Sequence, residues 1–375
     1  MFARENLVSA QRIVVKVGTS TLTYPNGKLN LDRIDKLARE LSDIRNQGKQ
    51  VILVTSGAVG VGMDRLGFSE RPKTIPGKQA AAAVGQGILM HIYEKMFGEY
   101  GQIVAQVLLT RADSVNSKRY ANSRNALMAL LNQGVIPIIN ENDVVAIDEL
   151  KIGDNDNLSA IVSSIVDADV LIILSDVSGL YTANPQQDPE AKLISCVSDI
   201  TPEIEGLAKG AGSMRAVGGM HTKIQAAKIA TNSGVTMIIA LGSQYGTIRG
   251  ILDGQEIGTV FVPKQAHSKI RKRWLAYGAK TSSKIIVDAG CEKALISKGS
   301  SVLAAGITKI EGSFEQGDII KVVCVDGREI ARGISNYSSE DIKKIMGVKT
   351  DSIAGILGSK PCNEVIHRDN MVLLV

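Results

Sequence analysis

Residues 13–20 are Ile-Val-Val-Lys-Val-Gly-Thr-Ser, and this stretch decides the fold. The apolar, β-branched run is typical of a strand buried on both faces, and the Gly-Thr-Ser after it is typical of a turn. Residues 31–47 then have the apolar spacing of an amphipathic helix, with one face formed by Ile34, Leu37, Leu41 and Ile44. Asn30 is a suitable N-cap for that helix and Gly48 a suitable end.

The same alternation continues through the first 260 residues. Five further apolar runs are predicted to be strands, namely Val51–Val54, Val104–Leu109, Val135–Ile139, Val170–Leu174 and Val235–Ala240. Helical patterns lie between them, including one over residues 117–132. Repeated strand–helix–strand order predicts an α/β fold, with an open, mainly parallel sheet sandwiched by helices.

The pattern changes after residue 262. Residues 263–281 hold six basic and no acidic residues without sustained periodicity, which is typical of a linker. Beyond them, Asp326-Gly327 separates two strand-like runs as in a β-hairpin, Ser338 is a suitable helix N-cap, and residues 365–375 suit a last strand. We therefore expect a larger domain over 1–262, a linker over 263–281 and a small β-rich domain over 282–360.

Composition excludes several classes of protein. The chain has 375 residues, 44% apolar and 22% charged, as in ordinary globular proteins. No apolar run is long enough for a membrane helix, and the N-terminus lacks the apolar core of a signal peptide. The cysteines lack zinc-site spacing and suit free thiols, so we expect a cytoplasmic protein without a membrane partner. They are Cys196, Cys291, Cys324 and Cys362.

Ligands of open parallel sheets bind at the carboxyl ends of the strands. Here five predicted strands end in small polar runs, namely Gly18-Thr-Ser-Thr21, Thr55-Ser-Gly-Ala58, Asn140-Glu-Asn-Asp143, Ser175-Asp-Val-Ser-Gly179 and Leu241-Gly-Ser243. One such turn needs no function, but five at one sheet edge predict a phosphate site. The P-loop motif and a G-x-G-x-x-G after the first strand are both absent.

Two lysines are unusual for their predicted positions. Lys16 lies inside a β-branched strand, and Lys223 lies in the first turn of a predicted helix, where the helix dipole disfavours a cation. The functional interpretation is that both contact phosphate. The non-functional alternatives are that Lys16 is an edge-strand lysine that faces water and that Lys223 is a solvated surface lysine.

An acidic run follows the fourth predicted strand. Six carboxylates fall within residues 141–156, namely Glu141, Asp143, Asp148, Glu149, Asp154 and Asp156. Gly153-Asp-Asn-Asp-Asn157 leads into a predicted helix over residues 158–166. This run is either a turn with an N-cap or a group that holds a substrate ammonium or a metal-bound phosphate.

As a set, these motifs resemble the glutamate 5-kinase family of the amino acid kinase superfamily. The resemblance rests on Val15-Lys-Val-Gly-Thr-Ser20, Thr55-Ser-Gly-Ala58, Ile139-Asn-Glu-Asn-Asp143, Gly153-Asp-Asn-Asp-Asn-Leu-Ser159, Ser175-Asp-x-x-Gly-Leu-Tyr181 and Gly218-Gly-Met-x-Thr-Lys223. The tail looks like a PUA domain, a small β-rich barrel, through Ile285-Ile-Val-Asp-Ala-Gly290, Lys298-Gly-Ser-Ser-Val-Leu303 and Gly317-Asp-Ile-Ile320.

The resemblance implies phosphorylation of the L-glutamate γ-carboxylate with ATP and Mg²⁺, as the first step of proline biosynthesis, with feedback inhibition by proline. It implies that Lys16 and Lys223 contact the transferring phosphoryl group and that Asp156 organises them. The implied ATP-binding residues are Lys16, Ser175, Asp176, Val217, Gly218, Gly219, Met220, His221, Thr222 and Lys223. The implied glutamate-binding residues are Ser56, Asp143 and Asn155, and no residue is assigned as a metal ligand.

Two alternatives stay open on the sequence. One is a sister kinase that acts on aspartate, N-acetylglutamate, carbamate or UMP, although a counter-ion at Asp143 suits a free ammonium and disfavours N-acetylglutamate. The other is an RNA-binding protein with a vestigial kinase fold, suggested by the basic linker and the PUA-like tail. The intact lysine pair and acidic run argue against it. We also expect a homo-oligomer, with RNA as a partner that the tail could bind.

Overall fold

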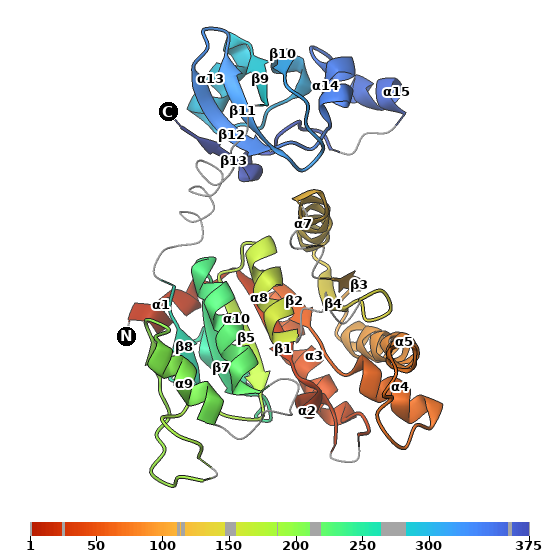
Figure 1. Cartoon of the computed structure of the whole chain (residues 1–375), viewed down its shortest axis with the longest axis vertical. Helices are drawn as coiled ribbons and strands as arrows, with labels where there is room; N and C mark the ends of the chain where they lie inside the picture. The colour runs from red at the N-terminus through yellow and green to blue at the C-terminus, as the bar shows by residue number, and fades with distance from the viewer. Residues whose placement is uncertain are drawn as a thin grey trace. The chain divides into compact units, whose positions relative to one another are not determined.

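A computed structural model gives the structure of the chain. It describes residues 2–24, 27–110, 113, 117–146, 155–185, 187–210, 219–263, 283–358 and 362–374. The chain forms two compact units (Figure 1). The first comprises Met1–Ala112 and Arg124–His267, and the second Asp113–Ser123 and Ser268–Val375. Apart from Pro263, the expected linker lies outside the described residues.

The first unit is built on an eight-stranded sheet in the order β3-β4-β2-β1-β5-β7-β8-β6. Its strands are β1 (Arg12–Val17), β2 (Gln50–Val54), β3 (Val104–Leu109), β4 (Ile136–Glu141), β5 (Val170–Ser175), β6 (Cys196–Val197), β7 (Thr236–Leu241) and β8 (Thr259–Phe261). Paired strands run parallel, except that β7 and β8 are antiparallel. The six predicted strands and the mainly parallel sheet are therefore confirmed.

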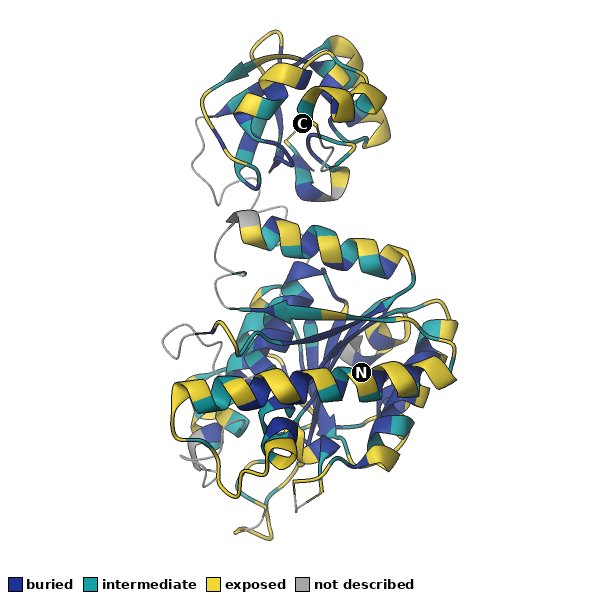
Figure 2. Ribbon diagram, turned by 90° about the vertical axis from the view of Figure 1, so that its right-hand side faces the viewer, coloured by how far each residue is buried: buried dark blue, intermediate teal, exposed yellow. Residues whose placement is uncertain are grey.

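Helices cover both faces of this sheet (Figures 1 and 2). The helices of the first unit are α1 (Phe2–Val8), α2 (Thr19–Leu22), α3 (Leu31–Asn46), α4 (Ala58–Leu66), α5 (Ile75–Glu99), α8 (Asn155–Ile165), α9 (Pro202–Gly210), α10 (Met220–Asn232) and α11 (Thr247–Leu252). Of α7 (Ser117–Asn132), residues 124–132 belong to the first unit and residues 117–123 to the second. The core on one face joins Ile13, Val15 and Val17 of β1 to residues of α3, α5 and α11. Since strand residues alternate between faces, Lys16 points to the other face, where α8 and α10 pack together.

The N-terminal signal predicted for α3 is present in the structure. The Asn30 side chain accepts a hydrogen bond from the Arg33 backbone N–H at 3.2 Å, so it caps the helix as expected. Gly48 follows the helix with a φ of +88°, a left-handed conformation that glycine adopts without strain. These local residues therefore set both ends of α3.

One expectation for the sheet is wrong. The apolar run Val104–Leu109 predicted a strand buried on both faces, whereas most of β3 is half-buried and Gln106 is exposed. The reason is that β3 is an edge strand, paired with β4 on one side only among the strands that the structure describes. An apolar run does not distinguish an edge strand from a central one.

Helices α4 and α5 pack backbone against backbone at two glycines. A Cβ atom on Gly85 would lie 1.8 Å from the Ala58 carbonyl oxygen, and one on Gly62 would lie 1.8 Å from the Ala81 carbonyl oxygen. Both distances are far below van der Waals contact, so no other side chain fits at either position. This contact fixes α5 against the segment that follows Ser56.

We expect Gly85→Ala to lower the free energy of unfolding by about 1–3 kcal/mol or more, because the added methyl group forces the two helices apart. Gly87→Ala is the matched control, since Gly87 is in the same helix and a Cβ there would meet no atom within 4 Å. The control should be neutral or stabilising by up to about 1 kcal/mol, as alanine favours helix. Denaturant unfolding of both variants measures the difference, and equal stabilities would contradict the packing described here.

The second unit is built on a five-stranded sheet in the order β10-β9-β11-β12-β13. Its strands are β9 (Lys284–Val287), β10 (Ile307–Glu311), β11 (Ile319–Cys324), β12 (Glu329–Ile334) and β13 (Met371–Leu373), and its helices are α13 (Ala289–Lys298), α14 (Ser339–Ile345) and α15 (Ile353–Leu357). The hairpin predicted at Asp326-Gly327 joins β11 to β12. Ser338 caps α14 as expected. The last strand, β13, is shorter than predicted and lies beyond residue 360.

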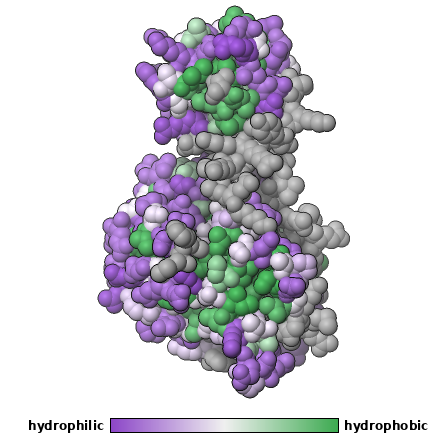
Figure 3. All heavy atoms as spheres, turned by 90° about the vertical axis from the view of Figure 1, so that its left-hand side faces the viewer, coloured by the Kyte–Doolittle hydropathy of each residue, from purple (hydrophilic) through white to green (hydrophobic). Residues whose placement is uncertain are grey.

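The surface of the first unit is mostly hydrophilic on the face shown in Figure 3, with apolar residues gathered in one area. Val8 of α1 is among the large apolar residues exposed in this unit, at 56%. None of the helices within the described residues combines the length and the apolar character needed to cross a membrane.

Candidate active site

Lys16, Asp156 and Lys223 form one buried group, which we call the lysine–aspartate cluster. The Lys16 Nζ lies 2.7 Å from Asp156 Oδ1, and the Lys223 Nζ lies 3.4 Å from Asp156 Oδ2. The Asp156 side chain is wholly inaccessible to solvent, and the two lysines are at most 5% exposed as residues. Thr222 Oγ1 donates a further hydrogen bond to Asp156 Oδ2 at 2.9 Å. The carboxylate therefore holds both ammonium groups in fixed positions.

Three elements bring the cluster together. Lys16 lies near the carboxyl end of β1, where it is opposite Val54 of β2 and Ile173 of β5. Asp156 and Lys223 lie in the first turns of α8 and α10, on the face to which Lys16 points. The expected phosphate-binding edge of the sheet thus holds two cations and one anion.

The start of α8 corrects the prediction from the sequence. The helix was expected over residues 158–166, but it begins at Asn155. Asn155 and Asp156 are therefore helical residues, and the acidic group lies at the positive end of the helix dipole, where it is favourable. A backbone fixed by helical hydrogen bonds also holds the carboxylate more rigidly than a loop does.

The bland alternatives for the two lysines are contradicted by the structure. Lys16 is on a central strand and is buried, so it is not an edge-strand lysine that faces water. Lys223 is also buried and paired, so it is not a solvated surface lysine. The unfavourable position of Lys223 at a helix start is offset by Asp156.

The pKa of Asp156 is governed by two opposing effects. Burial on its own raises the pKa, because the charged form loses its hydration, but the charges of Lys16 and Lys223 outweigh burial and hold the pKa below its usual value. Asp156 is thus ionised in the folded protein at neutral pH. An ionised Asp156 is therefore the shared counter-ion of the two buried lysines.

Ser56 and Asn155 meet beside the cluster. Asn155 Nδ2 has two hydrogens to share among three acceptors within hydrogen-bond distance, the Thr55 carbonyl oxygen at 2.9 Å, Ser56 Oγ at 2.8 Å and Asn140 Oδ1 at 3.0 Å. A carbonyl oxygen can only accept, so the Thr55 contact fixes which way the Asn155 amide faces. Ser56 accepts this bond, and its own hydroxyl hydrogen is left for an acceptor outside this group.

Asp143 lies at the same edge of the sheet. It follows β4, in a turn just after Glu141, and it is half-buried. Since β4 pairs with β2, Asp143 and Ser56 follow neighbouring parallel strands. Asp148, Glu149 and Asp154 lie outside the described residues, as do Val217 and Gly218.

The remaining expected ATP-binding residues occupy two places. Ser175 ends β5, next to β1, and its Oγ donates to Asp176 Oδ1 at 3.0 Å. Ser175 is buried and Asp176 is exposed. Gly219 is the N-cap of α10, and Met220, His221 and Thr222 form its first turn with Lys223. Both places adjoin elements that carry the lysine–aspartate cluster.

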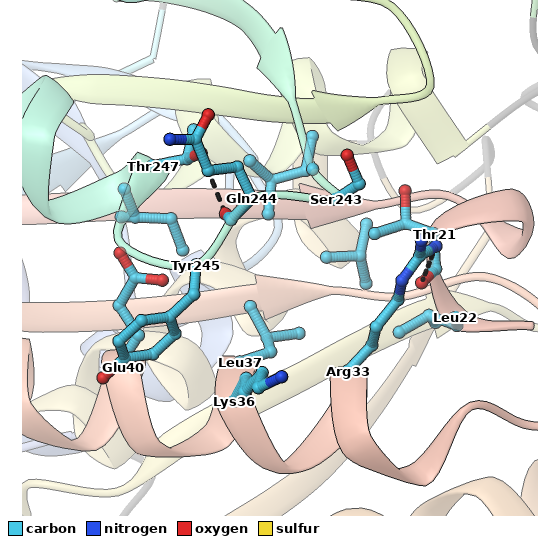
Figure 4. Close-up of a pocket in the computed structure, with 14 residues that line it drawn as sticks. Thr21, Leu22, Arg33, Lys36, Leu37, Glu40, Ser243, Gln244, Tyr245 and Thr247 are labelled. Atoms are coloured by element: carbon cyan, nitrogen blue, oxygen red, sulfur yellow. Dashed lines mark hydrogen bonds between the residues drawn. The ribbon is translucent and has the colours of Figure 1, made fainter.

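A separate hollow lies between α3 and the segment that joins β7 to α11 (Figure 4). Arg33 reaches across it toward Thr21, and Glu40 and Tyr245 lie at its other end. Ser243, from the last of the five strand ends, also lines it. None of the residues that the resemblance assigns to catalysis or to substrate binding lines this hollow, so it is distinct from the lysine–aspartate cluster.

Comparison with known proteins agrees with the geometry. Residues 11–240 match the amino acid kinase family. This chain belongs to the amino acid kinase family. Residues 283–357 of this amino acid kinase match the PUA domain. The family resemblance, the kinase fold and the second domain expected from the motifs are thereby confirmed.

Several proteins that resemble this chain over nearly its whole length have the same name. The chain is 55% identical to "Glutamate 5-kinase" of Moorella thermoacetica, over 98% of this chain and 97% of that protein. It is 53% identical to the protein of the same name from Thermoanaerobacter sp., over 97% of this chain and 98% of that protein. It is 50% identical to the protein of that name from Carboxydothermus hydrogenoformans, over 99% of this chain and 100% of that protein.

The sequence interpretation missed four residues that hold the site of this amino acid kinase. Thr55 and Asn140 contact Asn155 directly, while Gln86 and Tyr93 of α5 contact Asn140 and Thr55. Asn140 stood in a run already singled out at a strand end. Gln86 and Tyr93 lie inside a helix, where no strand-end or helix-cap signal marks them.

Proposed function

We propose that this chain transfers the γ-phosphoryl group of ATP to the γ-carboxylate of L-glutamate, giving L-glutamyl 5-phosphate, the first step of proline biosynthesis. The observation that carries the proposal is the lysine–aspartate cluster at the carboxyl edge of the sheet, beside Ser56 and Asn155. The names and near-equal lengths of the similar proteins support the choice of acceptor.

Lys16 and Lys223 supply the positive charge that the reaction needs. Glutamate's carboxylate and the ATP phosphates repel each other, and negative charge spreads over the equatorial oxygens of the transferring group. Two ammonium groups held by one carboxylate are pre-organised for that charge, so little reorganisation is required as it develops. Asp156 acts here as a positioning residue, with Thr222 as its hydrogen-bond donor.

Ser56, Asn155 and Asp143 suit the acceptor amino acid. The Ser56 hydroxyl has a hydrogen to donate to a carboxylate, since it already accepts from Asn155. The Asp143 carboxylate is a counter-ion for the α-ammonium group of glutamate. This division places the acceptor over β2 and β4, and ATP over β5 and the start of α10 with Ser175, Asp176 and Gly219 to Lys223.

Mg²⁺ fits this site as an ion carried by the nucleotide. Mg²⁺ keeps several waters and commonly binds substrate phosphates with one or two carboxylates. Each carboxylate oxygen of Asp156 already contacts the ammonium group of a lysine, so we do not assign Asp156 as a metal ligand. Across the described residues, no group of three metal-binding side chains occurs. When bound, the ion would neutralise phosphate charge alongside the lysines.

The second domain and the cellular setting complete the proposal. The PUA match supports RNA as a partner of the second unit, with an affinity that should fall steeply with salt if the basic residues 264–280 contribute.

We keep residues 1–262 and 282–360 as the two proposed domains, with residues 263–281 as the linker between them. All four cysteines are free thiols, which suits a reducing cytoplasm. Proline inhibition and a homo-oligomer remain part of the proposal.

An acceptor panel tests the proposed substrate. ATP consumption is measured with L-glutamate, L-aspartate, N-acetyl-L-glutamate, carbamate and UMP at equal concentrations. We expect L-glutamate to give the highest kcat/KM. A higher value for any other acceptor would assign the chain to a sister activity, and no turnover with any of them would favour the vestigial kinase.

Asp143→Ala tests the role of the counter-ion. We expect the KM for glutamate to rise about 10–100-fold, the loss typical of one charged hydrogen bond, while the KM for ATP stays within about twofold. Steady-state kinetics with each substrate varied in turn gives both constants. Equal rises in both KM values would contradict a specific contact with the acceptor.

A further inference from the structure

Helix α5 carries three polar side chains on one face. Gln79, Gln86 and Tyr93 are spaced by seven residues, close to two helical turns, so they lie in line along the helix. We call them the α5 stripe. Gln79 Nε2 donates to the Val144 carbonyl oxygen at 2.9 Å, and the Tyr93 and Thr55 hydroxyls are 2.8 Å apart.

Each member of the α5 stripe holds a segment that bears a proposed acceptor-binding residue. Gln79 holds the turn that contains Asp143, and Tyr93 holds the residue before Ser56. Gln86, between them, accepts a hydrogen bond from Asn140 Nδ2 at 2.8 Å, and Asn140 in turn accepts from Asn155. One helix thus contacts the supports of all three acceptor-binding residues.

The orientation of the Gln86 amide follows from a chain of fixed donors. The Glu141 backbone N–H donates to Asn140 Oδ1 at 2.9 Å, and a backbone N–H can only donate. Asn140 must therefore present its Nδ2 to Gln86, and Gln86 must present its Oε1. The Gln86 Nε2 is left buried, without a hydrogen-bond partner among the described residues.

Stability alone does not explain this arrangement. Gln86 is only 9% exposed and Asn140 only 2% exposed, so both amides have lost their hydration. The unpaired Gln86 Nε2 is a buried donor that opposes folding. The Glu141 N–H sets which way the Asn140 amide faces, and the Gln86 contact holds the other end of that amide, so that Asn140 Oδ1 stays in place to receive the Asn155 amide.

We propose that Gln86 is a positioning residue for the acceptor subsite, acting through Asn140 on Asn155 and Ser56. The inference rests on the proposed function, in which Asn155 and Ser56 bind the acceptor. The lysine–aspartate cluster does not depend on this chain of contacts, since Asp156 is held by Lys16, Lys223 and Thr222. Loss of the Gln86 contact should therefore affect acceptor binding and leave ATP binding unchanged.

Three substitutions at position 86 separate positioning from packing. Gln86→Met keeps the side-chain length but removes the acceptor oxygen, and Gln86→Asn keeps an amide that is too short to reach Asn140. Gln86→Glu retains an oxygen that can accept from Asn140. Gln102→Met is the matched control, since Gln102 bonds to Asn46 and to the Tyr100 backbone, away from these contacts.

We expect Gln86→Met and Gln86→Asn to raise the KM for the acceptor about tenfold, with the KM for ATP within twofold of the native value. The acceptor KM of Gln86→Glu should lie nearer the native value, and the acceptor KM of Gln102→Met should equal it. A purely structural role would instead lower the amount of active enzyme and leave both KM values unchanged. That result, or equal effects on the two substrates, would overturn the proposal.

A double-variant cycle tests the route through Asn155. If Gln86 acts through Asn155, then Gln86→Asn combined with Asn155→Ala should raise the acceptor KM no further than Asn155→Ala alone. Additive effects would overturn the proposed route. The KM is measured for whichever acceptor the native protein uses best in the panel. A different acceptor would therefore refute the proposed function, whereas an unchanged KM for the true acceptor refutes only the role of Gln86.

Discussion

Lys16→Ala and Lys223→Ala are each expected to lower kcat about 10²–10³-fold, with a much smaller change in the KM for glutamate. The reason is that each ammonium group matters most when negative charge develops on the transferring phosphoryl group, so its loss affects the transition state more than substrate binding. Steady-state kinetics with both substrates near saturation measures kcat, and thermal unfolding checks that each variant is folded.

Lys36→Ala is the matched control for the two lysine variants. Lys36 also pairs with a carboxylate, Asp32, at 2.7 Å, but both side chains are more than half exposed and neither belongs to the cluster. Its kcat should equal that of the native protein. If Lys16→Ala and Lys223→Ala also kept a native kcat while folded, the cluster would not be the site of phosphoryl transfer.

Asp156→Ala is expected to reduce both stability and turnover. Removal of the carboxylate leaves two buried lysines without their shared counter-ion, and loss of one member of a buried ion pair typically costs about 3–5 kcal/mol of unfolding free energy. Turnover should fall because the ammonium groups are no longer held at the transferring oxygens. Denaturant unfolding and kcat are measured on the same preparations.

Asp156→Asn separates charge from shape in the same position. The amide keeps the size of the side chain but carries no charge, so it should also destabilise the protein at neutral pH. Asp32→Ala is the control, because an exposed ion pair contributes at most about 1 kcal/mol. Native stability in Asp156→Asn would show that the lysines do not depend on the carboxylate.

The difference in stability between the native protein and Asp156→Asn should depend on pH in a definite direction. The folded pKa of Asp156 is lowered, so its ion pairs stabilise the protein above the unfolded pKa, which is about 3.9 for aspartate. That contribution is lost as the pH falls through the folded pKa. The stability difference between the native protein and Asp156→Asn should therefore be largest near neutral pH and shrink below about pH 4.

The order of strands and helices was predictable because its signals are local. A run such as Val170–Leu174 is apolar throughout, and β5 is buried throughout. Caps such as Asn30 and Ser338 act on residues three positions away. The edge position of β3 was not predictable, since burial at a sheet edge depends on which strands pair and not on the run itself.

The candidate site was predictable in its residue types from the local pattern, but its pairing was predictable only through the family resemblance. Lys16 and Lys223 stood out because a lysine is costly inside a strand or at a helix start without an anionic partner. The residue pattern alone offered six carboxylates as partners, and the family resemblance singled out Asp156, which the fold brings to Lys16 across 140 positions of the chain.

The supports of the acceptor subsite were the least predictable part. Gln86 and Tyr93 occur in a helix whose other residues are mostly small or apolar, and neither lies at a strand end. Their role depends on the packing of α5 against α4 and on the contacts with Asn140 and Thr55. Such contacts join residues tens of positions apart, so no local pattern contains them.

The most direct test of the central claim is to trap the product. Purified native protein is incubated with ATP, Mg²⁺ and L-glutamate in the presence of hydroxylamine, which converts an acyl phosphate to a hydroxamate that is quantified by its iron complex. We predict γ-glutamyl hydroxamate in step with ADP release, and about 10²–10³-fold less of it with Lys16→Ala. ADP release without hydroxamate, or equal hydroxamate from the native protein and Lys16→Ala, would contradict the account.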